Sequence, residues 1–120
     1  MAIENTILAH LVFDEAFSRK AVPYLKEEYF SNQTDKTLYK LVDEYIKKYN
    51  SIPSKEALII DLGNLSNISE DTFKNTKAEI ENLKVDEKTE LAWLLEKTEK
   101  FCQEKAVYNA IMSSIQILDN

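Results

Sequence analysis

The sequence predicts an all-α protein, built as a compact bundle of about five short helices followed by one long C-terminal helix. Two features of its composition support this fold class. The 120 residues include one glycine and two prolines, which leaves little material for β-hairpin turns, because those turns need residues that tolerate positive φ. Hydrophobic residues make up 44% of the chain and charged residues 30%, so we expect the chain to fold rather than to stay disordered.

The chain begins with two expected helices. Over residues 2–13, aliphatic side chains recur on one side of a helical wheel and polar side chains lie opposite. Asp14 can accept hydrogen bonds from the free amides of a short second helix that runs to residue 21. We expect Pro23 to end this helix by holding Val22 in an extended conformation.

An aromatic segment and a strongly amphipathic helix come next. The segment "PYLKEEYF" is expected to form a lid that buries Tyr24, Leu25, Tyr29 and Phe30. From Thr34, a good N-cap, apolar residues recur at three- and four-residue spacing. These residues are Leu38, Tyr39, Leu41, Val42, Tyr45, Ile46 and Tyr49. The pattern predicts a helix that packs one face against the core.

Two shorter helices are expected in the middle of the chain. In "NSIPS", Pro53 blocks helix continuation, and Ser54 can cap a helix that closes at Gly63. After a polar stretch, Ser69 can cap a further helix. Its narrow inward face is expected to consist of Phe73, Thr76, Ile80 and Leu83.

The last helix is expected to be unusually long, because no glycine or proline interrupts the chain from Lys88 to Leu118. About 30 helical residues span roughly 45 Å. Beyond Lys105, apolar residues occupy nearly the whole circumference, and a globule of this size cannot cover them on every side. We therefore expect contacts between subunits, or with another helix, at Val107, Tyr108, Ile111, Met112, Ile115 and Leu118. On this basis residues 1–86 are a globular domain and residues 87–120 a separate long helix.

The composition argues against several function classes. A net charge of −6 with a single arginine disfavours direct DNA binding through phosphate contacts. With one glycine, the chain can form neither a phosphate-binding loop nor a dinucleotide fingerprint. His10 and Cys102 are interpreted as structural residues, because no second histidine or cysteine stands at ligand spacing. We therefore expect no catalytic, cofactor-binding or metal-binding residue.

The sequence also lacks the usual marks of export or membrane insertion. The N-terminus carries Glu4 early and has no basic flank before its apolar run, so it does not read as a signal peptide. No apolar run approaches transmembrane length, and a single cysteine suits a reducing compartment. We expect a cytoplasmic protein without a membrane partner.

Two stretches carry a family resemblance, "IENTILAHLVFDEAFSRKAVPYLKEEYF" and "LYKLVDEYIKKYNSIPSKEAL". They resemble the N-terminal domain of hexameric replicative DNA helicases of the DnaB type, and most of all the branch found in large tailed phages. The matching positions are Glu4, Ile7, Leu8, Leu11, Asp14, Glu28, Tyr29, Phe30, Leu38 and Tyr39. The glycine that usually precedes the fourth helix is replaced by "NSIP", which favours the phage branch. The terminal "LLEKTEKFCQEKAVYNAIMSSIQILDN" resembles the first arm of the family's helical hairpin.

The resemblance implies a non-catalytic collar domain. Such domains pair through their hairpins, help to close the helicase ring and recruit primase, whereas ATP hydrolysis and most DNA contact belong to a C-terminal RecA-like motor. The expected partners are other copies of this chain, in a dimer or a hexameric ring, and primase. ATP and magnesium are expected only in the motor, which is missing here together with the second hairpin arm. The chain is therefore interpreted as an excised domain that acts in the host bacterial cytoplasm.

An alternative is a free-standing helical adaptor or inhibitor that docks on its partner through the same last helix. A reading frame that continues downstream into "GxxxxGK(S/T)" would favour the helicase, and a stop codon would favour the adaptor.

Overall fold

The computed structural model describes residues 2–119, and the side chains of residues 3–116. Within that part the elements are helices, and no strand forms, so the predicted all-α class is confirmed. In chain order they are α1 (Ala2–Phe13), α2 (Glu15–Ala21), η1 (Val22–Tyr24), η2 (Glu27–Tyr29), α3 (Gln33–Tyr49), α4 (Lys55–Gly63), α5 (Glu70–Asn82) and α6 (Leu91–Asp119).

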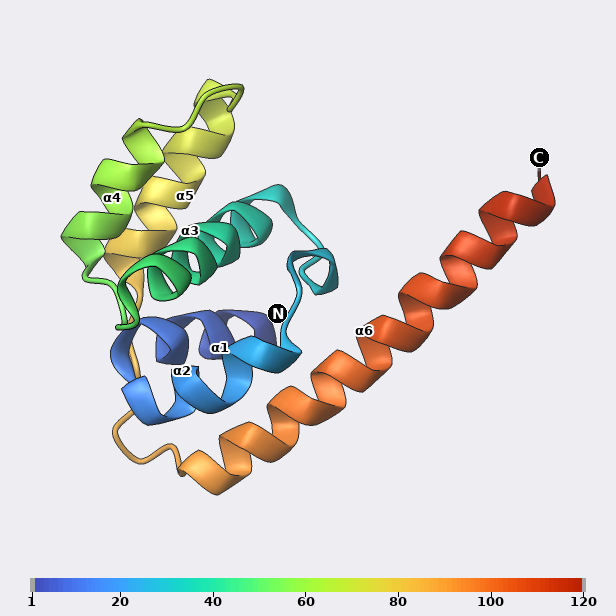
Figure 1. Cartoon of the computed structure of the whole chain (residues 1–120), viewed down its shortest axis with the longest axis horizontal. Helices are drawn as coiled ribbons and strands as arrows, with labels where there is room; N and C mark the ends of the chain where they lie inside the picture. The colour runs from blue at the N-terminus through green and yellow to red at the C-terminus, as the bar shows by residue number, and fades with distance from the viewer. Residues whose placement is uncertain (1, 120) are drawn as a thin grey trace.

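The helices are arranged around α3 and α1. The antiparallel pair α4 and α5 packs on one side of α3, and α1 packs on another side together with α2 (Figure 1). Helix α6 runs past α1, α2 and the short η2, and then projects away from the globule (Figure 1). At about 1.5 Å per residue, its 29 residues span roughly 44 Å, and the molecule measures 45 Å along its longest axis.

The core is apolar and centred on α1. Its largest fully buried apolar side chains come from all six α-helices and from the segment after η2: Ile7, Leu8, Leu11, Phe17, Phe30, Leu38, Val42, Leu58, Leu62, Ile80 and Leu94. Phe30 links two long helices, because its ring stacks on Tyr39 of α3 at 5.2 Å and lies 5.6 Å from Phe101 of α6. The Tyr39 hydroxyl donates to the Leu25 carbonyl at 3.1 Å, so the buried aromatic cluster also keeps its polar group satisfied.

Three predicted helix caps are confirmed. The side-chain oxygens of Asp14, Ser54 and Ser69 accept the backbone amides that start α2, α4 and α5, at 3.0–3.1 Å. The predicted cap at Thr34 is wrong. Asn32 caps α3 instead, because its side chain accepts the Asp35 amide at 2.7 Å and donates back to the Asp35 carboxylate at 3.1 Å.

The region around Pro23 also differs from the prediction. Val22 is not extended but helical, with φ −54° and ψ −41°, and the chain continues from α2 into η1. Proline is tolerated there because the first turn of a helix does not need its amide hydrogen. The chain becomes extended only at Leu25, and this leaves Tyr24 74% exposed instead of buried in the lid. Leu25, Tyr29 and Phe30 are buried as predicted.

Two further predictions, the burial of Tyr49 and the start of α6, were wrong in detail. Tyr49, expected on the packed face of α3, is mostly exposed at the end of that helix. Helix α6 starts at Leu91 instead of Lys88, because the preceding residues form a turn in which the Thr89 amide donates to the Asp86 carbonyl at 3.0 Å. The inward face predicted for α5 is confirmed, with Thr76, Ile80 and Leu83 buried.

Candidate functional site

The distal half of α6 presents large apolar side chains to solvent. The exposed fractions are 59% for Val107, 57% for Tyr108, 54% for Ile111, 40% for Met112 and 44% for Ile115. We call these five residues the α6 stripe. Leu118, the sixth predicted contact residue, lies outside the residues whose side chains the structure describes.

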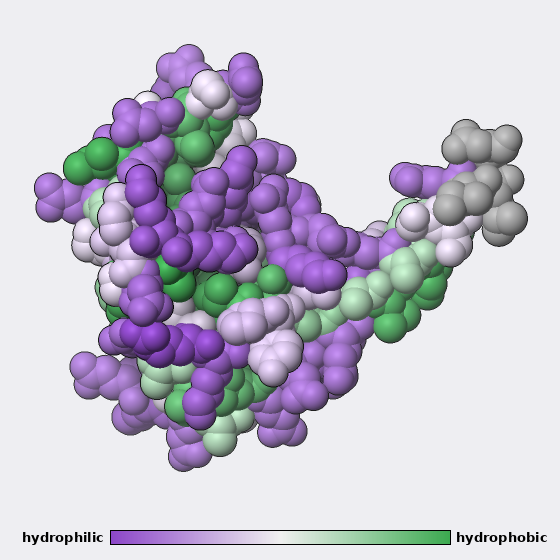
Figure 2. Space-filling model, in the orientation of Figure 1, coloured by the Kyte–Doolittle hydropathy of each residue, from purple (hydrophilic) through white to green (hydrophobic). Residues whose placement is uncertain are grey.

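The globule covers the first half of α6, and its contacts with this helix end near Asn109. Leu94, Phe101 and Cys102 are buried against it. The last polar contacts are from Lys105 Nζ to Ser31 Oγ at 3.1 Å and from Asn109 Nδ2 to the Glu28 carbonyl at 3.2 Å. From residue 110 to residue 116 every described side chain is exposed, and Figure 2 shows hydrophobic residues along this projecting part.

The α6 stripe occupies one side of the helix. At about 100° per residue its five members fall within about 140° of the helical wheel. The opposite side carries small residues, Ala106, Ala110 and Ser113. The distal helix is therefore less uniformly apolar than its composition predicted, since its large side chains are gathered on one face. A partner helix can pack against such a face.

A groove lies beside α6, where the helix passes α2 and η1. It has a volume of about 810 Å³ and is lined by residues of mixed character, among them Tyr24, Tyr29, Leu95, Cys102 and Ala106. The exposed Tyr24 stands at this groove instead of covering the core. The groove offers apolar contact at these residues.

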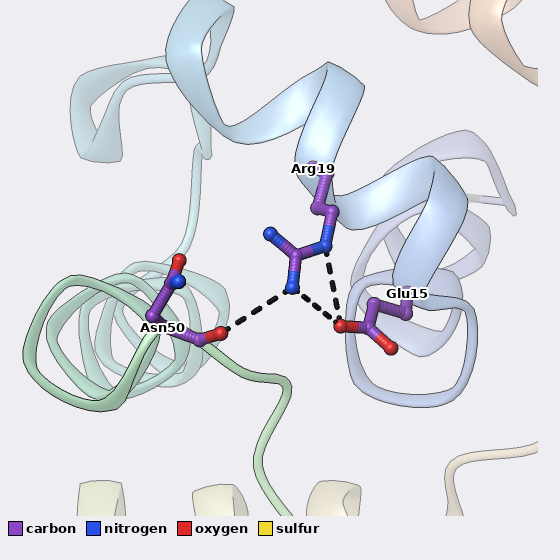
Figure 3. Close-up of polar contacts among 3 residues, drawn as sticks. All are labelled: Glu15, Arg19 and Asn50. Atoms are coloured by element: carbon purple, nitrogen blue, oxygen red, sulfur yellow. Dashed lines mark hydrogen bonds and ion pairs between the residues drawn. The ribbon is translucent and has the colours of Figure 1, made fainter.

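Arg19, the one arginine of the chain, lines the same groove but is held by its neighbours (Figure 3). Its guanidinium forms an ion pair with Glu15 at 2.7 Å and donates to the Asn50 carbonyl at 3.4 Å. Asn50 ends α3 in the left-handed conformation, with φ 55°, which turns its carbonyl toward α2. The contact joins α2 to the end of α3, so Arg19 is interpreted as a structural residue.

His10 and Cys102 are both buried in the packed part of the structure. His10 is buried in α1, where Nδ1 lies 2.9 Å from the Thr6 carbonyl, as expected for a donor to the preceding turn. Cys102 is a free thiol buried against the globule. Burial, with a smaller effect of the Glu99 charge, raises the pKa of this thiol.

One pair of ionisable residues was missed by the sequence reasoning. Asp35 is buried at the start of α3, and Glu79 of α5 lies against it. Burial raises the pKa of Glu79 to about 8, and a side-chain hydrogen bond to Asp35 and the Asp35 charge add to the effect. Helical spacing could have indicated that Glu79 faces inward. It is three residues after Thr76 and four before Leu83, which both lie on the inward face of α5.

Comparison with known proteins identifies a relative. The chain is 37% identical over 114 residues to a DnaB-like replicative helicase of Enterobacteria phage T4. The match covers 95% of this chain and 24% of that helicase, so the chain spans about a quarter of the relative's length. No known protein-family profile matches the chain. The resemblance to DnaB-type replicative helicases of phages, predicted from the sequence, is confirmed. Among the described residues, no helix is long and apolar enough to cross a membrane.

Proposed function

We propose that this chain, similar to about a quarter of a DnaB-like replicative helicase, is the non-catalytic N-terminal collar domain of a phage replicative helicase. Its function is to pair helicase subunits and so to help assemble the ring during DNA replication. The observation that carries the proposal is the α6 stripe, which the globule leaves uncovered in a chain with this relationship. Residues 1–86 form the globular part in this proposal and residues 87–120 the pairing arm.

The size of the α6 stripe supports a role in association. Burying an apolar side chain completely stabilises a complex by about 1.5–3 kcal/mol. Because roughly half of each side chain in the stripe is exposed, covering one contributes about 1 kcal/mol, and covering all five about 5 kcal/mol per subunit. Part of this is offset by the entropy lost on association, so the contact alone is expected to be reversible.

Catalysis belongs to another part of the helicase in this proposal. A RecA-like motor would bind ATP and magnesium, and the chain described here would act through contacts with other proteins. We propose primase as a second partner. This part of the proposal is supported by the family resemblance and not by a particular surface of the structure. A pull-down with the cognate primase tests it, using a chain that contains both hairpin arms. Absence of binding would remove primase docking from the proposal.

Sedimentation at micromolar concentration tests subunit pairing. We expect the unaltered chain to self-associate, and Ile111→Asp to shift it to monomer, because the new carboxylate would have to be desolvated in an apolar contact. Ser113→Asp is the matched control, since this exposed residue lies opposite the stripe and should leave association unchanged. A strict monomer, or association that survives Ile111→Asp, would contradict the pairing role.

A further inference from the structure

A second groove lies between the start of α1 and the first half of α6. It has a volume of about 570 Å³. Ile3 of α1 and the two aromatic residues Trp93 and Phe101 of α6 give it apolar walls. Phe101 is almost completely buried, whereas Trp93 is 47% exposed. Trp93 therefore supplies apolar surface that a binding partner can cover in this groove. We call it the lysine groove, after the residues described next.

Cations outnumber carboxylates in the lysine groove, although the chain as a whole carries a net charge of −6. The charged residues that line it are Lys97, Lys100, Lys105, Glu4 and Glu104. Trp93, Lys97 and Lys100 are four and three residues apart, so they follow one another on one side of α6. The rise from Trp93 to Lys100 is roughly 10.5 Å, a distance that about three or four residues of extended chain can span.

The lysines of the groove are available to a binding partner. Within residues 3–116, whose side chains the structure describes, Lys97 forms no ion pair. Lys100 pairs loosely with Glu104, at 3.9 Å, and the side chains are 68% and 66% exposed. Such an exposed pair contributes little, so a carboxylate from outside can compete with it. Lys105 Nζ contacts a neutral group, the Ser31 hydroxyl, at 3.1 Å.

We infer that the lysine groove binds an acidic peptide segment of a partner protein. An apolar side chain of the segment packs on Trp93, and its carboxylates lie at Lys97 and Lys100. The charges of the groove select an acidic segment, because complementary potentials favour the encounter. A single-stranded nucleic acid fits less well, since its bases need several exposed aromatic rings and its phosphates would meet Glu4 and Glu104. The lysine groove lies outside the α6 stripe, so the inference goes beyond subunit pairing.

Tryptophan fluorescence of the 120-residue chain tests the inference, because Trp93 is its only tryptophan. The probe is a hexapeptide of four aspartates and two phenylalanines, titrated to millimolar concentration at low salt. We expect a saturable shift of the emission to shorter wavelength, since the peptide covers the exposed part of the indole. The net negative charge of the chain opposes this binding, so a saturable shift reports a local contact. The same hexapeptide with lysine in place of aspartate should produce no saturable shift.

A charge reversal locates the binding site. Lys97→Glu should weaken binding of the acidic hexapeptide by about tenfold, because a carboxylate would then face the carboxylates of the peptide. Lys84→Glu is the matched control, since Lys84 is exposed, lies outside the groove and changes the net charge by the same amount. It should leave binding nearly unchanged. Circular dichroism checks that both variants keep the helical fold.

Four results would overturn the inference. The acidic hexapeptide could give no saturable shift, or Lys97→Glu and Lys84→Glu could bind it equally well. Tighter binding of a short oligothymidylate would identify a nucleic-acid site instead. Loss of self-association in Lys97→Glu, measured by sedimentation, would identify a second copy of the chain as the occupant. The first three results leave subunit pairing intact, because Ile111→Asp tests that role separately.

Discussion

The buried carboxyl of Glu79 should make the stability of the fold depend on pH, and Glu79→Gln should remove most of that dependence. Burial, followed by the hydrogen bond to Asp35 and the Asp35 charge, raises the pKa of Glu79 from 4.5 to about 8. Between these values the folded protein keeps a proton that the unfolded chain releases. The stabilisation is therefore complete below the unfolded pKa of 4.5 and is lost as the pH rises through about 8.

The magnitude follows from the same two pKa values. At about 1.4 kcal/mol per pH unit, the interval from 4.5 to 8 sets an upper limit of about 5 kcal/mol on the loss of unfolding free energy. Although Glu79 Oε2 is buried, the residue as a whole is only partly buried, so nearby solvent screens the charge and reduces this loss. We expect a loss of about 2 kcal/mol between pH 5 and pH 8 that is due to this group.

Urea unfolding followed by far-ultraviolet circular dichroism measures the effect at pH 5 and pH 8. Because a glutamine amide stays neutral at both pH values, Glu79→Gln should lose about 2 kcal/mol less stability than the unaltered chain over this range. Glu81→Gln is the control, since Glu81 is exposed on the same helix. If all three proteins show the same pH dependence, the protonated Glu79–Asp35 contact does not exist and the reasoning is refuted.

Two other predictions concern the stability of the fold. One compares a buried with an exposed aromatic residue, and the other compares the observed with the expected cap of α3. Phe30→Ala should lower the free energy of unfolding by about 3–5 kcal/mol, because the ring is fully buried between α3 and α6, whereas Tyr24→Ala should change it by less than about 0.5 kcal/mol. Asn32→Ala should cost about 1 kcal/mol through loss of the α3 cap, and Thr34→Ala should cost clearly less in the same urea titration. Equal effects within either pair would contradict the packing or the capping described here.

Much of the helical framework could be predicted because it depends on neighbouring residues. Asp14, Ser54 and Ser69 accept amides only three residues away, so their roles follow from short spacing. The start of α3, where Thr34 was the predicted cap, shows the limit of such reasoning. Both Asn32 and Thr34 have side chains that suit an N-cap. Asn32 caps the helix in the structure, where it accepts the Asp35 amide and also donates to the Asp35 carboxylate.

The candidate interface could be predicted in part. The sequence pointed to the distal half of α6, and five of its six candidate residues are at least 40% exposed on one side of that helix. Their role as contacts remains a prediction. The groove beside Tyr24 could not be foreseen, because it depends on how α2 and η1 meet α6 in space.

The sequence by itself determined the all-α class, most helix ends and the resemblance to phage replicative helicases, because composition, caps and apolar periodicity act over a few residues. Tertiary structure decided which side chains those helices cover. In the folded chain Tyr24 is exposed and Glu79 lies against Asp35. The globule buries Leu94 and Phe101 of α6, whereas Tyr108 and Ile115 of the same helix stay exposed. These outcomes depend on the directions in which whole helices pack, and residues on different helices meet only when that packing is complete.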